Sequence, residues 1–171
     1  MASAAVITVS DSRSQGRRED LSGPAVVQLL QSHSIQVVHQ VVVPDEQGIL
    51  EETLRTLADR FPLIVTTGGT GIAPRDVTPE ATRAVCDRLL DGLPELMRAE
   101  GRKETPFSVL SRAVCGVRGK SLILNLPGSP RGATSSLRVV LPLISHVLTL
   151  LAGGETHHEP PLTSPAGEDG P

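Results

Sequence analysis

Aromatic residues are nearly missing from this sequence of 171 residues, which contains Phe61 and Phe107 but neither Trp nor Tyr. Positive charge is not in excess either, because 16 Lys and Arg stand against 19 Asp and Glu, for a net charge of −3 at pH 7. Proteins that bind nucleic acid carry a basic face, and those that bind single strands also stack bases on aromatic side chains. The composition therefore argues against a nucleic-acid-binding protein and predicts an aliphatic core.

Cysteine is scarce too, with Cys86 and Cys115 alone. Their spacing is not that of metal ligands, and a disulfide scaffold needs more cysteines, so we interpret both as reduced thiols. The segment MASAAVITVSDS lacks the basic region of a signal peptide, and no apolar run approaches the ~20 residues that a membrane span requires. We therefore expect a soluble, cytoplasmic protein without a membrane partner.

The length and a hydrophobic content of 39% suit one domain with its own core. Short runs rich in β-branched residues alternate with segments whose apolar residues recur at helical spacing. This alternation predicts an α/β fold of three layers (αβα) with a mostly parallel, doubly wound sheet. The predicted strands cover residues 4–9, 35–43, 63–67 and 120–126, and the predicted helices cover 23–33, 45–61, 78–90 and a long segment that ends near residue 151.

Two parts of the chain are less regular. Residues 92–119 contain Gly and Pro at short intervals, which predicts short helical pieces. The final helix contains Pro142, where we expect a kink. After Ala152 the sequence is rich in Pro, Gly and acidic residues. We therefore expect a domain over residues 1–153 and a disordered tail over 154–171.

Four loops leave the carboxyl ends of predicted strands, where doubly wound sheets bind their ligands. Each loop carries small or acidic residues. Because parallel strands end at one edge of the sheet, we expect the loops to converge on one site. They are SDS (10–12), PDE (44–46), GGTG (68–71) with Arg75 and Asp76 behind it, and PGSPRG (127–132).

The segment TTGGTGIAPRDVTPEAT (66–82) is the most informative of the four. Its glycines permit positive φ and let a ligand approach bare N–H groups, and the helix that follows presents its positive end to an anion. Arg75 adds positive charge. Asp45 and Asp76 suffice as protein ligands for Mg²⁺, which also takes substrate phosphates and waters. The pattern favours phosphoryl or nucleotidyl transfer, in which positioning and charge stabilisation dominate.

Structural roles also account for several of these residues. Asp45 is placed as a helix N-cap, and so are Thr78 and Ser129, each of which precedes a proline. Residues 10–12 are typical of turns that end a strand. A functional role is favoured by the convergence of acids and glycines at one edge of the sheet, which independent caps have no reason to produce.

Two nucleotide-binding motifs are incomplete in this sequence. GTGIAP (69–74) begins like the dinucleotide fingerprint GxGxxG, but Pro74 replaces the third glycine and the segment follows the third strand. GKS (119–121) resembles the end of a Walker motif, but Val114 stands where the first glycine is required, and a strand follows instead of a helix. A nicotinamide site and a P-loop are therefore excluded.

The segments TTGGTGIAPRDVTPEAT and LILNLPGSPRG (122–132) together resemble the two signature segments of the molybdenum-cofactor biosynthesis family. TVSDS (8–12) and VVPDEQGI (42–49) match its other loops. The resemblance runs from about Ala4 to Gly153 and is closest to the molybdopterin adenylyltransferases, including the G domains of plant and animal fusion proteins. It implies a molybdopterin-binding-like αβα domain, usually a homotrimer. It also implies that ATP and Mg²⁺ are used to adenylylate the terminal phosphate of molybdopterin, with release of pyrophosphate before a molybdenum-insertion step.

By position, the resemblance assigns the family's functional acids to Asp45 and Asp76, which are expected to bind Mg²⁺ and handle the nucleotide phosphates. Arg75 is added because of its charge. The residues that match the family's pterin- and phosphate-contacting loops are Ser10, Asp11, Gly68, Gly69, Thr70, Gly71, Gly128 and Ser129.

Three hypotheses stay open at this point. The first is an adenylyltransferase, and the second is a carrier of the same fold that binds molybdopterin or the finished cofactor without adenylylating it. The third is a trimeric scaffold that organises partner proteins. The glycine loop serves the first two alike, whereas intact acids at positions 45 and 76 favour catalysis.

Overall fold

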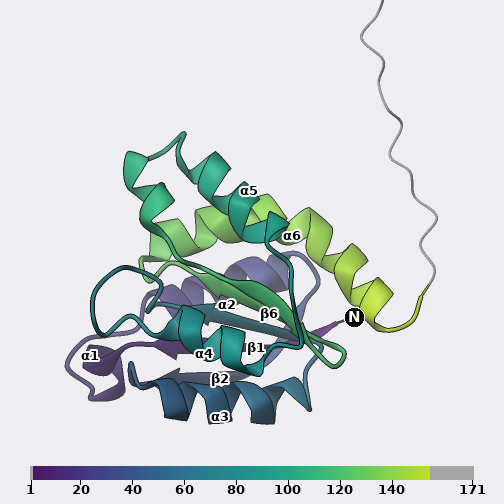
Figure 1. Ribbon diagram of the computed structural model, residues 1–171, viewed down its shortest axis with the longest axis horizontal. Helices are drawn as coiled ribbons and strands as arrows, with labels where there is room; N and C mark the ends of the chain where they lie inside the picture. Colours follow the sequence, from purple (N-terminus) through teal and green to yellow (C-terminus); the bar gives the residue numbers. More distant parts are fainter. Residues whose placement is uncertain (1, 155–171) are drawn as a thin grey trace, which may run out of the picture.

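The computed structural model describes residues 2–154, which form an α/β fold around one sheet of six strands (Figure 1). The strands are β1 (Ser3–Val9), β2 (Gln36–Val43), β3 (Leu63–Thr67), β4 (Arg88–Leu89), β5 (Cys115–Arg118) and β6 (Ser121–Leu126). The helices are α1 (Asp11–Ser14), α2 (Ser22–Ser32), α3 (Gln47–Ala58), α4 (Thr78–Val85), α5 (Gly92–Gly101), the 3-10 helix η1 (Pro106–Leu110) and α6 (Pro130–Leu151).

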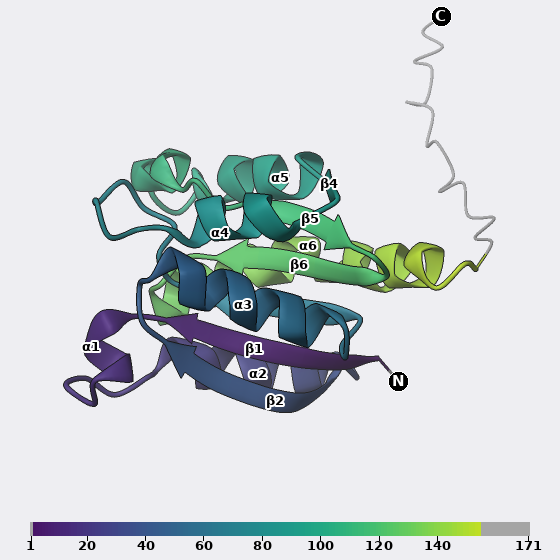
Figure 2. The same ribbon diagram turned by 60° about the horizontal axis from the view of Figure 1, so that its bottom comes forward.

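The sheet has the strand order β2-β1-β3-β6-β5-β4, and its first four strands are parallel. In Figure 2 the arrowheads of β1, β2 and β6 point to the same side, so the loops that follow them meet at one edge. β1 lies between β2 and β3, and the chain therefore reverses its direction across the sheet after β2. Doubly wound sheets open a crevice for ligands at such a reversal. The predicted αβα fold with a mostly parallel sheet is confirmed.

Helices cover both faces of the sheet, because neighbouring residues of a strand point to opposite sides. Ala4 and Val6 belong to the core under α2, α5 and α6, whereas Ala5, Ile7 and Val9 belong to the core under α3 and α4. Figure 2 shows α3 in front of the sheet and α2 behind it. The core is aliphatic, as the composition predicts.

The segment between α4 and β6 differs from its prediction. The predicted helix over 78–90 ends at Val85, and residues 88–89 form β4. Within the segment expected to form only short helical pieces, residues 115–118 form β5, which pairs antiparallel with β6. Gly119, at φ 55°, makes the turn of this hairpin. Strands of two and four residues are too short to show a period, so the sequence pattern missed both.

The last helix, α6, runs unbroken from Pro130 to Leu151, so Pro142 lies inside it and does not end it. By length and composition α6 is apolar enough to cross a membrane. Because the sequence lacks an uninterrupted apolar run of this length, its pattern did not predict such a segment. Leu137, Val140 and Ile144 of α6 are buried against the sheet, although most of the helix is not buried. Apart from Gly154, the predicted tail lies outside the described residues.

Candidate active site

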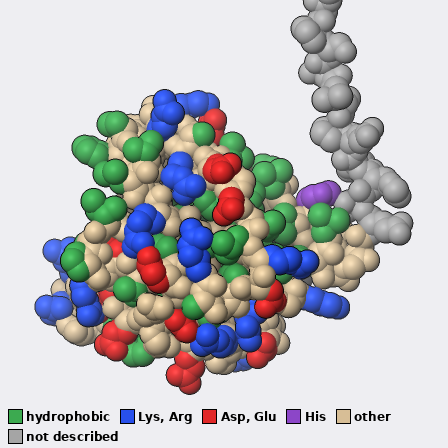
Figure 3. Space-filling view, viewed as in Figure 1, with side chains coloured by type: hydrophobic (Ala, Val, Ile, Leu, Met, Phe, Trp, Pro, Cys, Tyr) green, Lys and Arg blue, Asp and Glu red, His purple; other side chains and the backbone are tan. Residues whose placement is uncertain are grey.

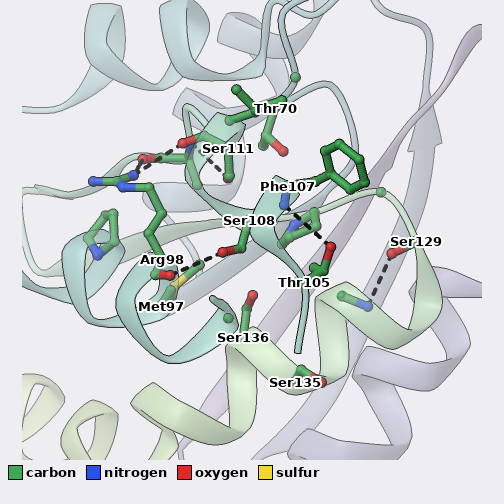
Figure 4. A pocket seen from close by; sticks show the side chains of 18 of the residues that line it. Thr70, Met97, Arg98, Thr105, Phe107, Ser108, Ser111, Ser129, Ser135 and Ser136 are labelled. Carbon is green, nitrogen blue, oxygen red and sulfur yellow. Dashed lines mark hydrogen bonds between the residues drawn. The ribbon is translucent and has the colours of Figure 1, made fainter. Parts of the chain in front are cut away.

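A cavity of about 520 Å³ opens beside the glycine loop, residues 68–71, at the carboxyl edge of the sheet. Its walls come from α5 and η1 on one side and from the first turns of α6 on the other, as Figure 4 shows. Most of its exposed lining is apolar, but seven side chains with hydroxyl groups contribute to it. These side chains are Thr70, Thr105, Ser108, Ser111, Ser129, Ser135 and Ser136.

Apolar side chains form part of the cavity rim. Ile72 and Phe107 line the cavity yet are 72% and 75% exposed. Figure 3 shows apolar side chains gathered over η1, while Lys and Arg elsewhere on this face are mixed with Asp and Glu. The face drawn there is not a continuous basic surface of the kind that nucleic-acid-binding proteins use.

The glycine loop has a backbone that residues with side chains rarely adopt. Gly68 and Gly69 have φ of 102° and 65°. A Cβ on Gly69 would stand 2.3 Å from Oγ1 of Thr78. That hydroxyl donates to the Gly68 carbonyl at 2.9 Å, so Thr78 holds the loop. The N-cap of α4 is Val77, and the predicted N-cap role of Thr78 is wrong.

The two predicted acids lie on either side of the glycine loop. Asp76 lines the cavity beside Gly71, and its Oδ2 accepts the Ala73 N–H at 2.8 Å. Asp45 lies outside the cavity wall, with Oδ1 at 3.2 Å from the point where a Cβ of Gly69 would stand. The pKa of Asp45 is raised, first by burial, and the negative charge of Asp76 is among the further causes. The loop therefore has a carboxylate next to Gly69 and another next to Gly71.

Asp11 and Asp45 hold each other through a reciprocal pair of hydrogen bonds. The Asp11 N–H donates to Asp45 Oδ2 at 2.8 Å, and the Asp45 N–H donates to Asp11 Oδ1 at 3.0 Å. Arg75 donates through Nε and Nη2 to Asp11 Oδ2 at 2.9 and 2.7 Å, and this bonding holds the pKa of Asp11 below its usual range. Asp45 thus binds the loop after β1, and the N-cap of α3 is Glu46. The alternative of Asp45 as a helix cap is wrong.

The remaining predicted residues fall into two groups. Gly128 and Ser129 line the cavity together with Gly69, Thr70 and Gly71. Ser129 is also the N-cap of α6, because its Oγ accepts the Gly132 N–H at 3.1 Å. The other predicted residues lie outside the cavity wall, on the surface between the loops that follow β1, β2 and β3, which we call the rim between these loops. They are Ser10, which caps α1, and Asp11, Gly68 and Arg75.

Sequence reasoning missed the wall formed by α5, η1 and α6. The sequence pattern pointed only to loops that follow the ends of parallel strands. Arg98 and Ser108 lie instead in the connection between α4 and β5. A signal for one part was present, because Thr134, Ser135 and Ser136 interrupt the apolar pattern of the last helix. Arg112 was missed as well. It bonds to the loop that carries Asp76.

The glycine loop lies at the carboxyl edge of a mostly parallel sheet, with one carboxylate beside Gly69, another beside Gly71 and the cavity next to it. These features define a doubly wound α/β protein, a class that commonly binds small ligands at this edge. Residues 5–146 match the family described as "probable molybdopterin binding domain", and the chain belongs to that family.

Relatives with assigned names support this membership. The molybdopterin adenylyltransferase of Helicobacter pylori is 43% identical over 152 residues, which cover 86% of each chain. The molybdopterin adenylyltransferase of Escherichia coli is 41% identical over 79% of this chain and 71% of its own. Among solved structures, the molybdopterin biosynthesis enzyme MoaB of Thermus thermophilus is 49% identical, with a TM-score of 0.85 over 90% of this chain and 98% of its own.

Proposed function

We propose that this protein is a molybdopterin adenylyltransferase that transfers AMP from ATP to the terminal phosphate of molybdopterin and releases pyrophosphate. Relatives at 41–43% identity carry this name, which favours the enzyme over a non-catalytic carrier. The structural observation that carries the proposal is the pair of carboxylates on either side of the glycine loop, of which Asp76 lines the cavity and Asp45 lies outside it. A carrier needs the cavity but has no use for two acids that flank an anion-binding loop.

The cavity suits molybdopterin because it combines apolar walls with many hydroxyl groups. Met97 and Phe107 offer surface to a flat ring system, while Ser108, Ser111 and Ser136 offer hydrogen bonds to ring nitrogens and oxygens. The terminal phosphate would then lie toward the glycine loop, because no hydrogen bond within residues 2–154 uses the N–H groups of Gly69, Thr70 and Gly71.

The rim between the loops after β1, β2 and β3 suits the phosphates of ATP. Arg75 is bonded to Asp11 but its side chain is 62% exposed, so its guanidinium faces both the rim and solvent. Backbone N–H groups of the loop and the positive end of α4 add to the positive potential. These groups stabilise charge on the α-phosphorus and on the leaving pyrophosphate.

A magnesium ion fits the donor atoms found here. Among residues 2–154, no three side chains of His, Cys, Asp or Glu form a metal site by themselves. Asp45 and Asp76 each accept an N–H through Oδ2, and no hydrogen bond within residues 2–154 uses their Oδ1 atoms. Mg²⁺ takes one or two carboxylates and fills its shell with phosphates and water. We therefore infer that Asp45 and Asp76 would hold it, and that it would supply charge neutralisation for the phosphates.

The transfer itself needs no nucleophile from the protein. An oxygen of the molybdopterin phosphate attacks the α-phosphorus of ATP, the new P–O bond forms, and the bond to the β-phosphate oxygen breaks. The chain contributes orientation, because it places two substrates that meet at the glycine loop. We further expect a homotrimer, a cytoplasmic location and a downstream molybdenum-insertion protein as the acceptor of the product.

The test combines the purified chain with molybdopterin, ATP and Mg²⁺ and measures pyrophosphate together with the adenylylated pterin. We expect both products in equal amounts, and we expect neither after the divalent cation is removed by a chelator. Tight binding of molybdopterin without pyrophosphate would select the carrier instead. Release of pyrophosphate without molybdopterin would point to a different acceptor.

A further inference from the structure

Arg112, between η1 and β5, bonds to the loop that carries Asp76 at several points. Its backbone N–H donates to the Thr70 carbonyl at 2.8 Å. Its guanidinium donates to the Gly71 carbonyl through Nε and to the Asp76 carbonyl through Nη2, both at 2.7 Å. The same guanidinium forms an ion pair with Glu80 of α4.

These bonds matter because, among residues 2–154, the only other hydrogen bonds from the loop tip to the rest of the domain are those of Arg75 to Asp11. Ile72 is 72% exposed, and residues 73–75 are exposed as well. The hydrogen bonds inside the tip join Ala73 and Asp76 to each other, in a local turn that does not reach the domain. Arg112 thus connects both ends of the exposed tip, Gly71 and Asp76, to one planar group.

We propose that Arg112 is a positioning residue that fixes the carboxylate of Asp76 at the cavity mouth. This inference rests on the proposed function, in which Asp76 holds Mg²⁺. Three loop carbonyls accept from one residue, so a movement of the loop tip breaks several bonds together. Arg112 does not itself line the cavity, and its guanidinium bonds the main-chain carbonyl of Asp76, with no hydrogen bond to the carboxylate of that residue. Its effect on transfer is therefore indirect.

Arginine is required for this geometry. A guanidinium is planar and donates in fixed directions, so it serves two carbonyls and a carboxylate at once, whereas an ammonium is a compact charge on a flexible stem. Glu80 also accepts from the guanidinium, through both Nη atoms. The ion pair with Arg112 also lowers the pKa of Glu80, so the pair stays charged at neutral pH.

The first variants are Arg112→Ala and Arg112→Lys, with Arg88→Lys as the matched control. Arg88 has an exposed side chain on the edge strand β4, away from the glycine loop. For Arg112→Ala we expect kcat to fall about 100-fold, because small displacements of reacting groups cost that much. The KM for molybdopterin should change little. The Mg²⁺ concentration that gives half of the maximal transfer rate should rise. Arg112→Lys should lie between Arg112→Ala and the parent.

Added guanidinium ion gives a readout that a general structural role does not produce. At millimolar concentration it should restore part of the kcat of Arg112→Ala and leave the parent and Arg88→Lys unchanged. If Arg112→Ala loses activity only in proportion to its folded fraction, with no response to guanidinium or Mg²⁺, the positioning role is overturned.

Hydrogen exchange of the protein without ligands separates this inference from the proposed function. In Arg112→Ala the amides of Ala73, Asp76 and Thr78 should exchange faster, while those of β1 and β6 should not. If the loop exchanges faster in Arg112→Ala but the parent chain transfers no AMP, the contact of Arg112 is upheld and the adenylyltransferase function is refuted. Unchanged exchange in the loop would refute the role of Arg112 even if the parent chain is active.

Discussion

At the scale of single residues, the site contains two aspartates, Asp11 and Asp45, that are hydrogen-bonded to each other but have opposite pKa shifts. Arg75 keeps Asp11 charged and lowers its pKa, whereas burial raises the pKa of Asp45. Asp11 therefore serves as a fixed acceptor for the Asp45 N–H, and Asp45 keeps an oxygen directed at the glycine loop. A buried carboxylate gains from a nearby cation, which lowers the cost of its charge. This asymmetry favours Asp45 as a metal ligand over Asp11.

Replacement of Asp76 by Asn should keep the fold and remove most of the transfer activity. Asp76 belongs to a surface loop outside both cores, so the thermal midpoint should stay close to that of the parent. Loss of one fixed charge at the phosphates should lower kcat about 100-fold or more. Pyrophosphate release measures the rate, and Asp59→Asn at the exposed end of α3 is the control. A parental rate in Asp76→Asn would show that Asp76 has no role in catalysis.

Replacement of Glu80 by Gln should make stability less dependent on pH. Arg112 lowers the folded-state pKa of Glu80 relative to the unfolded chain. Such a carboxylate stabilises the fold above its unfolded pKa, near 4.3, and loses this contribution as the pH falls through its lower folded pKa. The pair is partly exposed, so Glu80→Gln should cost about 0.2–1 kcal/mol at pH 7. Denaturant unfolding at pH 7 and pH 3.5 measures the effect, and an equal cost at both values would contradict the prediction.

At the scale of elements, the site depends on a loop whose conformation only glycine adopts easily. Gly68 packs against the Val9 carbonyl, where a Cβ would come within 2.3 Å, and Gly128 packs against Gly68. The loops after β1, β3 and β6 therefore touch through backbone atoms. Side chains would hold them apart, so the absence of a Cβ is what lets three loops form one surface.

Replacement of Gly69 by Ala should distort this surface. The φ of 65° costs an alanine about 1–2 kcal/mol. Its Cβ would also displace the Thr78 hydroxyl, which lies 2.3 Å from that position. We expect the transfer rate to fall at least about 10-fold, because the loop moves relative to both carboxylates. Thermal unfolding and initial rates measure the two effects.

The matched control for this substitution is Gly48→Ala in α3, where no atom lies within 4 Å of the added Cβ. There the alanine should stabilise the protein by about 0.4–1 kcal/mol without a change in rate. An equal loss of rate in both variants would show that the loop geometry has no special role.

At the scale of the whole molecule, two aliphatic cores on opposite faces hold the sheet rigid beneath the site. β1 and β6 are almost completely buried, whereas the residues that would contact substrates lie on the exposed loops at their ends. A rigid sheet with variable loops at its edge is a frequent basis for catalysis. Substitutions at the rim should therefore change activity far more than stability.

Shortening the chain after Gly154 should leave stability and transfer unchanged. Among residues 2–154, Leu151 is the last partly buried residue packed against the cores. The sequence after Gly154 is rich in Pro, Gly and acidic residues and offers little apolar surface to bury, so its removal should cost little. Thermal unfolding and the transfer assay compare the shortened chain with the full one. A fall in either would show that the functional unit extends beyond the proposed domain of residues 1–153.

The sequence by itself determined the class of fold and the principal loops of the site. Runs such as Leu63–Thr67 are long and β-branched enough to show a strand, and the glycines of residues 68–71 mark the loop that follows it. Parallel strands end at one edge of a sheet, so the convergence of these loops follows from topology. The chemical roles of Asp45 and Asp76 remain predictions, and Asp76→Asn tests the second of them.

Only the tertiary structure decided which side chains meet. Asp11 and Asp45 are 34 residues apart, and Arg112 bonds to the carbonyl of a residue 36 positions earlier. Local periodicity holds no information on such distant pairs. The short strands β4 and β5 were likewise set by pairing, of β4 with β5 and of β5 with β6, and not by their own residues. Contacts of this kind depend on the packing of the entire domain, which is why the cavity wall and Arg112 became visible only in the folded chain.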